Sequence, residues 1–464
     1  MSAPPSAAAA AISPAMRALA KYISAGAVVP IPATVAAKAK HHLLDTIAAM
    51  VSGAVLPPGQ LALAYAANLG GNREACVPGS RLVTCAVHAA MAGGICAHAD
   101  ETDDSHQPAF FHPGCAIVPA ALAMAERQHS SGAQLMRAVV LGYEVGARIS
   151  LALGAMAFHQ RGFSSHSVGG LFGASAAAGT LAGLTPEQCR WLLSYTAQQA
   201  SGVSCWMRDP SHVEKAFVLG GMTARNAVYT ATMVQSGMSG VDDVFAGSPN
   251  FFSTYNPSAS MELLVAGLGE CHEIMRANIK KWSVGSPVQA ALDSMHSLMT
   301  AHRLTADDIE RIHVQVRDDE AGIVDGRDAP NINLQHLIAL MVVDQGLDFA
   351  SSHDFGRMRD PRVMALRERV VFEGSVALRE AGGRQALLEV ATTTKGVLRH
   401  HTHAVRGAAE NPMTDAEVDA KCMGLLAPVL GARRSRRLAD TVWAIDTLDD
   451  VATMRGLLQA RRTA

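Results

Sequence analysis

The chain has 464 residues, of which 49% are hydrophobic, 17% are charged and 5% are aromatic. A soluble domain usually has about 25% charged residues, so this composition excludes a disordered chain and predicts a large hidden surface, either in the core or between subunits. The 39 Lys and Arg residues balance 41 Asp and Glu residues to a formal net charge of −2, which excludes the basic footprint of a nucleic-acid-binding protein. The length predicts two or three domains.

The N-terminal residues 1–14 are predicted to be disordered. Prolines interrupt this segment and its start is not basic, so we do not expect a signal peptide. None of the 8 cysteines forms a C-x-x-C pair, which predicts scattered buried thiols in a reduced, cytoplasmic setting. The longest uncharged stretch, 162–186, has the length of a membrane span, but it is rich in Gly, Ala and Ser and contains His166. We therefore expect a buried core helix there and no membrane association.

Helical periodicity fills most of the chain from residue 15 to about residue 265. The predicted helices are bounded mostly by Gly, Pro, Ser or Thr and span residues 33–51, 81–98, 114–127, 132–153, 169–182, 186–202 and 212–237. Strands and helices do not alternate in this part, so we do not expect a Rossmann-like sheet.

The pattern changes after about residue 270. Residues 286–301 and 334–345 keep helical periodicity, whereas Ile312, Val314 and Val316 alternate with polar residues as in a half-buried strand. Helices return from residue 415. Further strands are predicted at 370–373, 387–394 and 396–400, the last two as a pair.

These patterns predict a mainly α protein with a large all-α helical domain and an inserted smaller α+β lid domain. The helical domain comprises residues 15–269 and 406–464, and the lid domain comprises residues 270–405. A cleft between two domains is a usual place for a small-molecule site. The chain has no P-loop, no G-x-G-x-x-G after a strand, no H-E-x-x-H and no G-x-S-x-G, so nucleotide-driven, metalloprotease and serine-hydrolase functions are not expected.

The most informative segment runs from His98 to Gly114. It holds four carboxylates and three histidines, of which His112 precedes a proline. A carboxylate–imidazole cluster can hold and tune a general acid or base, which favours an active site without metal. A metal site is the second interpretation, because His98 and Glu101 lie one helical turn apart. The third is structural, with the acids capping helix N-termini.

Four further segments contain candidate polar residues. His166 lies near the start of a helix of small residues, whose free N–H groups attract carboxylates, so it either touches an anionic ligand or is a core residue. Lys215 and Arg225 lie in an apolar helix, where a buried cation must meet an anion or reach the surface. Lys280, in a basic pair, is suited to a substrate carboxylate, and His336 faces either the cleft or the core.

The order and spacing of these segments resemble the MmgE/PrpD family over residues 15–430. The resemblance implies a helical domain with a lid domain, a homodimer, a small di- or tricarboxylate substrate, and no metal or organic cofactor. The segments that carry it are His98–Gly114 with its H-x-x-[DE]-x-D-D core, Gly142–Arg148, Phe163–Gly173 and Lys215–Asn226, with Asn411-Pro-Met and Lys421 near the end.

The resemblance also assigns roles to individual residues. The residues so assigned are Glu101 for the family's acidic position, with Asp103, Asp104 and Ser105 beside it, His112 for the family's histidine, and Lys215 and Lys280 for its two lysines.

Several positions depart from the family's decarboxylase-like members. Glu101 and Ser105 stand where those members have Asp and Thr, Gly285 where they have a second histidine, and His336 where they have a tyrosine. Their Gly-[FW]-His-x-Thr pattern corresponds to 162–166, where the histidine comes last. The resemblance therefore implies a reaction class rather than a particular substrate.

We hypothesise that His112 is the general acid/base, oriented by Asp103 or Asp104. Binding of substrate carboxylates requires cations and hydrogen-bond donors. We also expect further acid/base groups beside His112. The residues predicted for these roles are Lys215, Lys280, Arg225 and Ser105 for binding, with His166 and His336 as secondary groups.

Three functions stay open at this point: a cofactor-independent lyase, an epimerase or racemase with groups on opposite faces of its substrate, and a non-enzymatic helical interaction protein. The expected partners are a small carboxylate substrate and a second copy of the chain, with no nucleic acid and no membrane.

Overall fold

The structure is a computed structural model that describes residues 12–460. The chain is mainly α-helical, as predicted, and forms two compact units. The first unit contains the described residues up to Ala99, together with Asp104–Ala277 and those from Leu426 onward, and the second contains Asp100–Asp103 and Asn278–Leu425. The consecutive residues Asp103 and Asp104 therefore belong to different units.

The segment 1–14 was predicted to be disordered, and its residues 1–11 lie outside the described residues. Ser13 accepts a hydrogen bond from Met16 N and caps helix α1, which begins at Pro14. The prediction of disorder therefore extends too far, because a capping serine followed by proline is a helix start.

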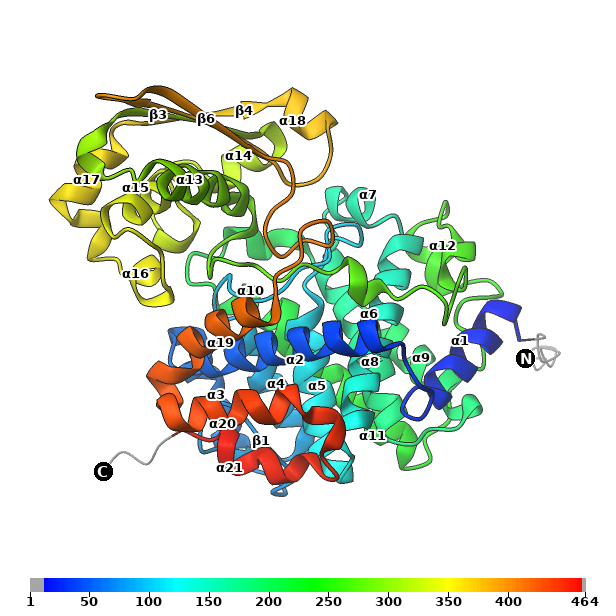
Figure 1. The fold of residues 1–464 in the computed structure, drawn as a ribbon. Helices are drawn as coiled ribbons and strands as arrows, with labels where there is room; N and C mark the ends of the chain where they lie inside the picture. The colour runs from blue at the N-terminus through cyan, green and yellow to red at the C-terminus, as the bar shows by residue number, and fades with distance from the viewer. Residues whose placement is uncertain (1–11, 461–464) are drawn as a thin grey trace. The chain divides into compact units, whose positions relative to one another are not determined.

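Helices make up nearly all of the first unit (Figure 1). They confirm the predicted helices to within a few residues, with two exceptions described below. The longer ones are α1 (Pro14–Ala25), α2 (Ala33–Gly53), α3 (Pro57–Leu69), α4 (Ala86–Ala97), α5 (Pro113–Gln128), α6 (Gly132–Ala152), α8 (Ser165–Leu181), α9 (Pro186–Gln199), α11 (Met222–Gln235) and α20 (Ala432–Trp443). The short ones are α7 (Ala155–Gln160), α10 (Val213–Ala216), α12 (Phe251–Tyr255) and α21 (Arg455–Leu458).

Helix α8 is buried along its whole length, which confirms the predicted core helix. Glycines let it approach α6 backbone to backbone. A Cβ on Gly173 would meet the carbonyl oxygen of Gly142 at 2.5 Å, and one on Gly146 would meet that of Gly169 at 2.5 Å. The glycines of the two family-like segments are therefore packing residues that hold α6 and α8 in close contact.

The predicted helix 81–98 is wrong at its start. Val83–Thr84 form strand β2, which pairs antiparallel with β1 (Ala75–Cys76), and α4 begins only at Ala86. The side chain of Glu74 accepts a hydrogen bond from Ala86 N at 2.9 Å. This cap comes from a residue before the helix pattern, so local periodicity does not show where the helix starts.

The single helix predicted for 212–237 is interrupted. Its residues form α10, a π-helical turn η2 (Phe217–Gly221) and α11. A Cβ on Gly220 would meet the carbonyl oxygen of Gly94 on α4 at 2.1 Å. The wide turn therefore falls where two backbones cross in contact, and such turns are frequent at functional sites.

The second unit has helices and one larger sheet. Its helices are α13 (Gln289–His302), α14 (Asp318–Val324), α15 (Leu334–Val343), α16 (Phe349–His353), α17 (Pro361–Arg367) and α18 (Val376–Glu380). Its strands are β3 (Ile309–Arg317), β4 (Val370–Ser375), β5 (Ala386–Thr392) and β6 (Gly396–Thr402). They confirm the predicted strands and the predicted pairing of the last two, which is antiparallel.

The strand order of this sheet is β4-β3-β5-β6. Ile312 of β3 pairs in parallel with Val370 and antiparallel with Val390. Helices α13 and α15 lie along one face of the sheet (Figure 1), and Ile312, Val314 and Val316 are buried there. The alternation along β3 thus follows from one covered face and one open face.

The second unit reaches Leu425, beyond the predicted boundary at residue 405. Arg406 binds Glu417, and Lys421 Nζ donates to Thr102 O at 3.1 Å. These bonds join the first part of helix α19 (Asp415–Leu430) to the second unit. The role of the second unit as a lid stays a prediction.

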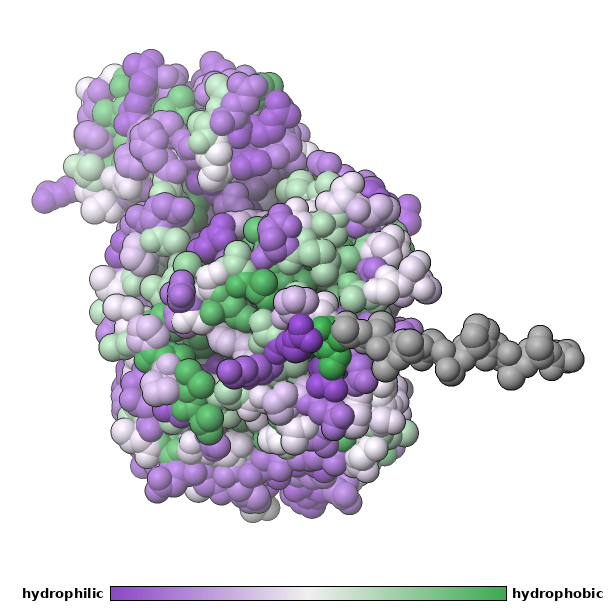
Figure 2. Space-filling model, turned by 90° about the vertical axis from the view of Figure 1, so that its right-hand side faces the viewer, coloured by the Kyte–Doolittle hydropathy of each residue, from purple (hydrophilic) through white to green (hydrophobic). Residues whose placement is uncertain are grey.

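Across residues 12–460, no single helix has the length and apolar composition needed to cross a membrane. Helices α2 and α3 meet these two criteria only when they are taken together, and the pair is bent by 83°. Figure 2 shows a face of the protein where hydrophobic residues lie in small groups among hydrophilic ones. Along α3, Leu61, Tyr65 and Leu69 are 58%, 57% and 44% exposed and follow one another at about one turn.

Candidate active site

Five histidine rings form a cluster in the first unit, here named the histidine cluster. The ring of His98 lies 5.0 Å from that of His112 and 5.2 Å from that of His212, centroid to centroid. The ring of His112 lies 5.3 Å from that of His166, which is 5.9 Å from that of His159. The structure therefore brings the predicted residues His112 and His166 together and adds His159 and His212, which sequence analysis did not assign.

Helix ends present the rings of this cluster. His98 is the C-cap of α4, His112 is the N-cap of α5, and His166 lies in the first turn of α8. Pro113 occupies the first position of α5, where a missing N–H group costs nothing. Each of these histidines is held by the end of a helix, so the positions of the three rings are set by the packing of the helices.

A short hairpin, residues 106–111, precedes His112. Its ends, His106 and Phe111, exchange backbone hydrogen bonds of 2.8 and 3.4 Å. The ring of His106 accepts a backbone N–H at Nδ1, so its Nε2 carries the proton and donates to Glu273 at 3.0 Å. Phe110 has a φ of 49°, unusual for a bulky residue, and its ring lies against the histidine cluster.

Burial lowers the pKa of His166 well below its ordinary value, and electrostatic repulsion from His112, His159 and Lys215 lowers it further. Burial also lowers the pKa of His159. His166 is therefore neutral near pH 7, and no described residue forms a hydrogen bond with its Nδ1. A neutral imidazole can donate its one N–H to an anionic ligand, while its other ring nitrogen can accept a proton.

Lys215 stands beside an aromatic residue that sequence analysis missed. Its Nζ lies 5.5 Å from the ring centre of Trp206, and this ring lies 5.4 Å from that of His166. Trp206 belongs to the turn η1 (Ser204–Arg208), is 6% exposed, and its indole N–H has no hydrogen-bond partner among the described residues. No local pattern distinguishes it from an ordinary core aromatic residue.

Arg225 lies on α11 and is half-buried. Its Nε donates to Asn226 Oδ1 at 3.0 Å, and its guanidinium lies 5.6 Å from the ring centre of Phe217. These contacts hold the side chain along its own helix, so a role in carboxylate binding stays a prediction.

Asp104 joins three helices of the first unit. This buried carboxylate accepts hydrogen bonds from His42 Nδ1 at 2.6 Å, Tyr143 OH at 2.5 Å and Gly114 N at 2.8 Å. Burial lowers the pKa of His42 to about 4, so this ring donates as a neutral imidazole. The neighbouring Ser105 is buried, and its hydroxyl has no partner among the described residues.

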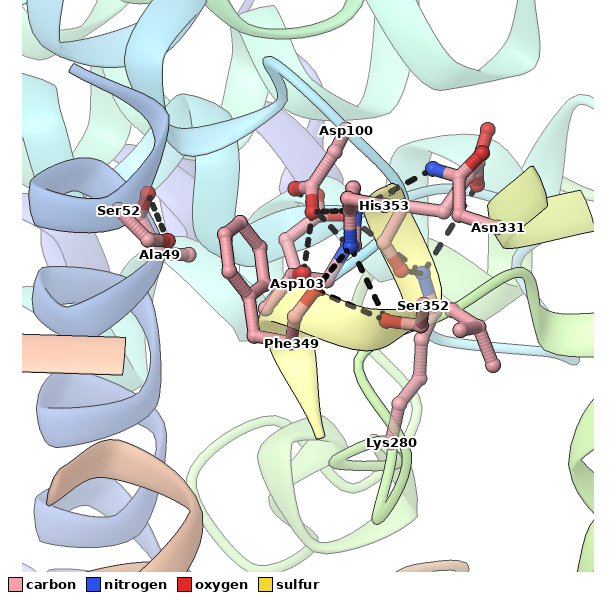
Figure 3. A network of polar contacts seen from close by, with 12 residues as sticks. Ala49, Ser52, Asp100, Asp103, Lys280, Asn331, Phe349, Ser352 and His353 are labelled. Atoms are coloured by element: carbon pink, nitrogen blue, oxygen red, sulfur yellow. Dashed lines mark hydrogen bonds and ion pairs between the residues drawn. The ribbon is translucent and has the colours of Figure 1, made fainter. Parts of the chain in front are cut away.

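The other acids of the segment belong to the second unit together with Lys280 (Figure 3). Lys280 Nζ donates to the carbonyl oxygen of Glu101 at 2.6 Å and lies 3.6 Å from Asp103 Oδ1. The side chain of Glu101 is 4.0 Å away. The structure therefore brings the predicted residues Lys280, Glu101 and Asp103 together. A substrate carboxylate would have to compete with Glu101 and Asp103 for the ammonium group of Lys280.

Asp100 pairs with His353, which sequence analysis did not assign (Figure 3). His353 Nε2 lies 2.8 Å from Asp100 Oδ2, while its Nδ1 donates to Phe349 O at 2.8 Å. Burial alone would raise the pKa of Asp100, but hydrogen bonds from His353 and Thr102 outweigh it and leave this pKa below its usual value. The sequence signal near His353 is the capping box that begins α16 at Asp348, which predicts a helix and not a site.

His336 lies on α15 in the second unit and is completely buried. Burial, and then the charges of Arg367 and Arg357, lower its pKa to about 4. Asn333 caps α15 by accepting a hydrogen bond from His336 N at 2.9 Å. Of the two alternatives from the sequence, the structure supports a core position for His336.

Gly285 leaves little room for the histidine found in decarboxylase-like members. A Cβ at this position would meet Ile332 Cδ1 at 2.0 Å. A histidine here would therefore require Ile332 to move, which is consistent with a site that differs from theirs.

Comparison with known proteins identifies the family. Residues 17–264 match the MmgE/PrpD N-terminal domain and residues 282–447 match the MmgE/PrpD C-terminal domain. The chain therefore belongs to the MmgE/PrpD family, which confirms the resemblance drawn from the four segments.

Similar proteins extend over almost the whole chain. A cis-aconitate decarboxylase-like protein of Aspergillus oryzae is 25% identical over 92% of this chain and 94% of its own length. A cis-aconitate decarboxylase of Aspergillus terreus is 24% identical over 92% of both chains. At the level of the family, these relatives support a lyase of the dehydratase or decarboxylase type.

Proposed function

We propose that the protein is a cofactor-independent lyase that dehydrates or decarboxylates a small di- or tricarboxylic acid. The observation that carries the proposal is the histidine cluster, in which imidazoles lie beside Lys215 and the indole of Trp206, whose N–H has no partner in the described part of the chain. The family and its decarboxylase-named relatives support the same class of reaction.

The chemistry begins next to a carboxylate, where a C–H proton is weakly acidic. In a dehydration, one group takes this proton while an acid protonates the leaving hydroxyl, so that water departs and a double bond forms. In a decarboxylation, the C–C bond to the carboxylate breaks, CO₂ departs, and an acid protonates the carbon left behind. Both reactions need a positioned acid/base and a cation that stabilises the developing negative charge.

We assign the acid/base role to His112, with the neutral His166 as the second group. Lys215 and the indole of Trp206 bind a substrate carboxylate, and Lys280 is a further residue to which we assign carboxylate binding. Ser105, whose buried hydroxyl has no described partner, is suited to a substrate oxygen. Glu101 and Asp103 lie near the ammonium group of Lys280 and keep it in a fixed position, so we assign them a positioning role.

The test replaces His112 by glutamine. The His112→Gln variant should fold normally and lose at least about 100-fold in kcat on the true substrate, because a positioned general acid/base contributes that much or more. His129→Gln, an exposed histidine at the end of α5, is the matched control and should keep full activity. Full activity of the His112→Gln variant would remove His112 from the mechanism.

The substrate itself is found by a screen of ligand-induced thermal stabilisation with a panel of di- and tricarboxylic acids, cis-aconitate included. The departures at Glu101, Ser105, Gly285 and His336 lead us to expect a ligand other than cis-aconitate. No stabilisation by any acid of the panel would favour the non-enzymatic alternative.

An epimerase is the second candidate. The stacked rings of His112 and His166, with an angle of 28° between their planes, supply two acid/base groups side by side. An epimerase needs its two acid/base groups on opposite faces of one carbon, whereas these two rings are stacked against each other, so their arrangement favours the lyase. Solvent-derived deuterium in substrate recovered without net elimination would favour this function over the lyase.

The homodimer, the absence of a cofactor, the cytoplasmic location and the role of the second unit as a lid are further parts of the proposal. The exposed apolar row of Leu61, Tyr65 and Leu69 on α3 supports a subunit interface. Analytical ultracentrifugation of a Leu61→Glu variant tests this, because the substitution should shift the protein from dimer to monomer. Imidazoles also suit transition metals, so the cofactor-independent mechanism needs its own test. If no metal takes part, dialysis against a chelator leaves activity unchanged. Loss of activity that a divalent metal restores would contradict the mechanism.

A further inference from the structure

We propose that a cavity in the second unit binds a small polyanion, either phosphate or a polycarboxylate, and that protonation of histidines controls its affinity. The cavity has a volume of about 330 Å³, which is in the range of small-molecule sites. This inference does not depend on the proposed function. Its lining residues that carry or can acquire positive charge are Lys281, His296, His400, His401, His403 and Arg406.

The acids near the cavity already have partners. Asp293 on α13 accepts the indole N–H of Trp282 at 2.9 Å and the backbone N–H of Arg406 at 2.7 Å. The guanidinium of Arg406 donates to Glu417 and to Asn411. With neutral imidazoles, Lys281 and Arg406 balance Asp293 and Glu417, so each protonated histidine adds one net positive charge to the cavity.

The imidazoles leave ring nitrogens for a ligand. His400 Nδ1 lies 3.2 Å from Ser294 Oγ, and His401 Nε2 lies 2.9 Å from Gln385 Oε1, so one nitrogen of each ring has a described partner. The rings of His401 and His403 are 3.7 Å apart, centroid to centroid. Two protonated rings at this distance repel each other unless an anion lies next to both.

The surroundings of two of these rings, His296 and His401, favour the neutral form. Burial and Lys281 lower the pKa of His296, and burial, His403 and His400 lower that of His401. A bound anion favours the charged form of each ring and takes up protons when it binds. The other charged residues that line the cavity are Lys281, Asp293 and Arg406. Glu417 pairs with Arg406, and Arg399, the neighbour of His400 in the chain, pairs with Glu389 on β5.

A ligand in this cavity would act on the segment that carries Lys280. Lys280 is 3% exposed and bonds to Glu101, whereas the next residue, Lys281, lies over the ring of Trp282 at the cavity. Gln289 on α13 binds both the N–H and the carbonyl of Trp282. The same helix therefore lines the cavity and holds the backbone beside Lys280, which makes the cavity a candidate effector site.

Titration calorimetry on the full-length protein tests the proposal, with inorganic phosphate and citrate as separate probes. At least one probe should bind at about pH 6 and lose at least about tenfold in affinity by about pH 8, because binding takes up protons. The heat should vary with the ionisation enthalpy of the buffer for the same reason. Whichever probe binds identifies phosphate or polycarboxylate as the ligand.

Matched variants locate the site. Lys281→Gln and His403→Gln should each weaken binding at least about fivefold, while Lys395→Gln, which removes an exposed lysine of the same unit, should not. Equal affinity at both pH values would overturn the proposal. Binding that survives Lys281→Gln but is lost in Lys215→Gln would also overturn it, since the anion would then occupy the histidine cluster. Binding of Zn²⁺ but of neither anion would show a metal site instead.

Discussion

A buried indole N–H without a hydrogen-bond partner is costly, and that of Trp206 has none within residues 12–460. Its neighbours are Lys215 and the neutral His166, so the surroundings are cationic and contain few acceptors. A ligand carboxylate would satisfy the indole and the lysine together. At the scale of single residues, this makes Trp206 a candidate specificity residue that the local sequence does not reveal.

The variant Trp206→Phe keeps an aromatic ring beside Lys215 and removes the N–H group. We expect kcat/KM to fall about 10- to 100-fold, since a hydrogen bond to a charged group contributes about 1.5–3 kcal/mol, with little change in melting temperature. Trp191→Phe is the control, because the indole of Trp191 donates to the exposed Asp242 instead. Equal losses in both variants would contradict a specific role for Trp206.

Asp104 illustrates the opposite case, a residue of the predicted site with a clear structural function. Asp104→Ala leaves buried donors of His42, Tyr143 and Gly114 without their acceptor. We expect a loss of about 3 kcal/mol or more in the free energy of unfolding, measured by urea denaturation. Ser105→Ala should change it by less than about 1 kcal/mol, and a similar loss in that variant would argue against the assignment.

At the scale of elements, the crossing of α4 with the π-turn η2 positions two parts of the site. Helix α4 ends at His98, and η2 directly follows the short helix that carries Lys215. Gly94 and Gly220 let the two backbones touch. Periodicity predicted both helices but neither the crossing nor the π-turn, because both depend on a partner far away in the chain.

The variant Gly220→Ala places a Cβ 2.1 Å from the carbonyl oxygen of Gly94, where backbone cannot yield easily. We expect a loss of at least about 2 kcal/mol in stability and a lower kcat. Gly424→Ala in α19 is the control, since a Cβ there meets nothing within 4 Å and should stabilise the helix by up to about 1 kcal/mol. A stable, active Gly220→Ala variant would show that the contact is not needed.

At the scale of the whole molecule, each unit contains a buried histidine that resists protonation. The pKa values of His42 in the first unit and His336 in the second are lowered from 6.5 to about 4, mainly by burial. Below about pH 6.5 the unfolded chain takes up protons that the folded chain cannot, so stability falls as the pH drops toward 4. Above pH 7 these two groups contribute no pH dependence.

The variant His336→Leu should reduce this acid sensitivity. Between pH 7 and pH 5 we expect it to lose about 1–2 kcal/mol less stability than the unchanged protein, as measured by urea denaturation at each pH. The comparison of slopes removes any constant effect of the substitution. Parallel pH profiles for the two proteins would contradict a neutral, buried His336.

The sequence by itself determined most of the helices, the strands of the larger sheet, the family, and the segment that contains His112, because periodicity, capping residues and motif order can be read along the chain. Only the tertiary structure decided which side chains meet. It joined His106 to Glu273, 167 residues away, and His42 to Asp104, 62 residues away. It also divided the adjacent acids Asp103 and Asp104 between two units. Burial and ion pairing arise from such distant contacts, and no local pattern encodes them.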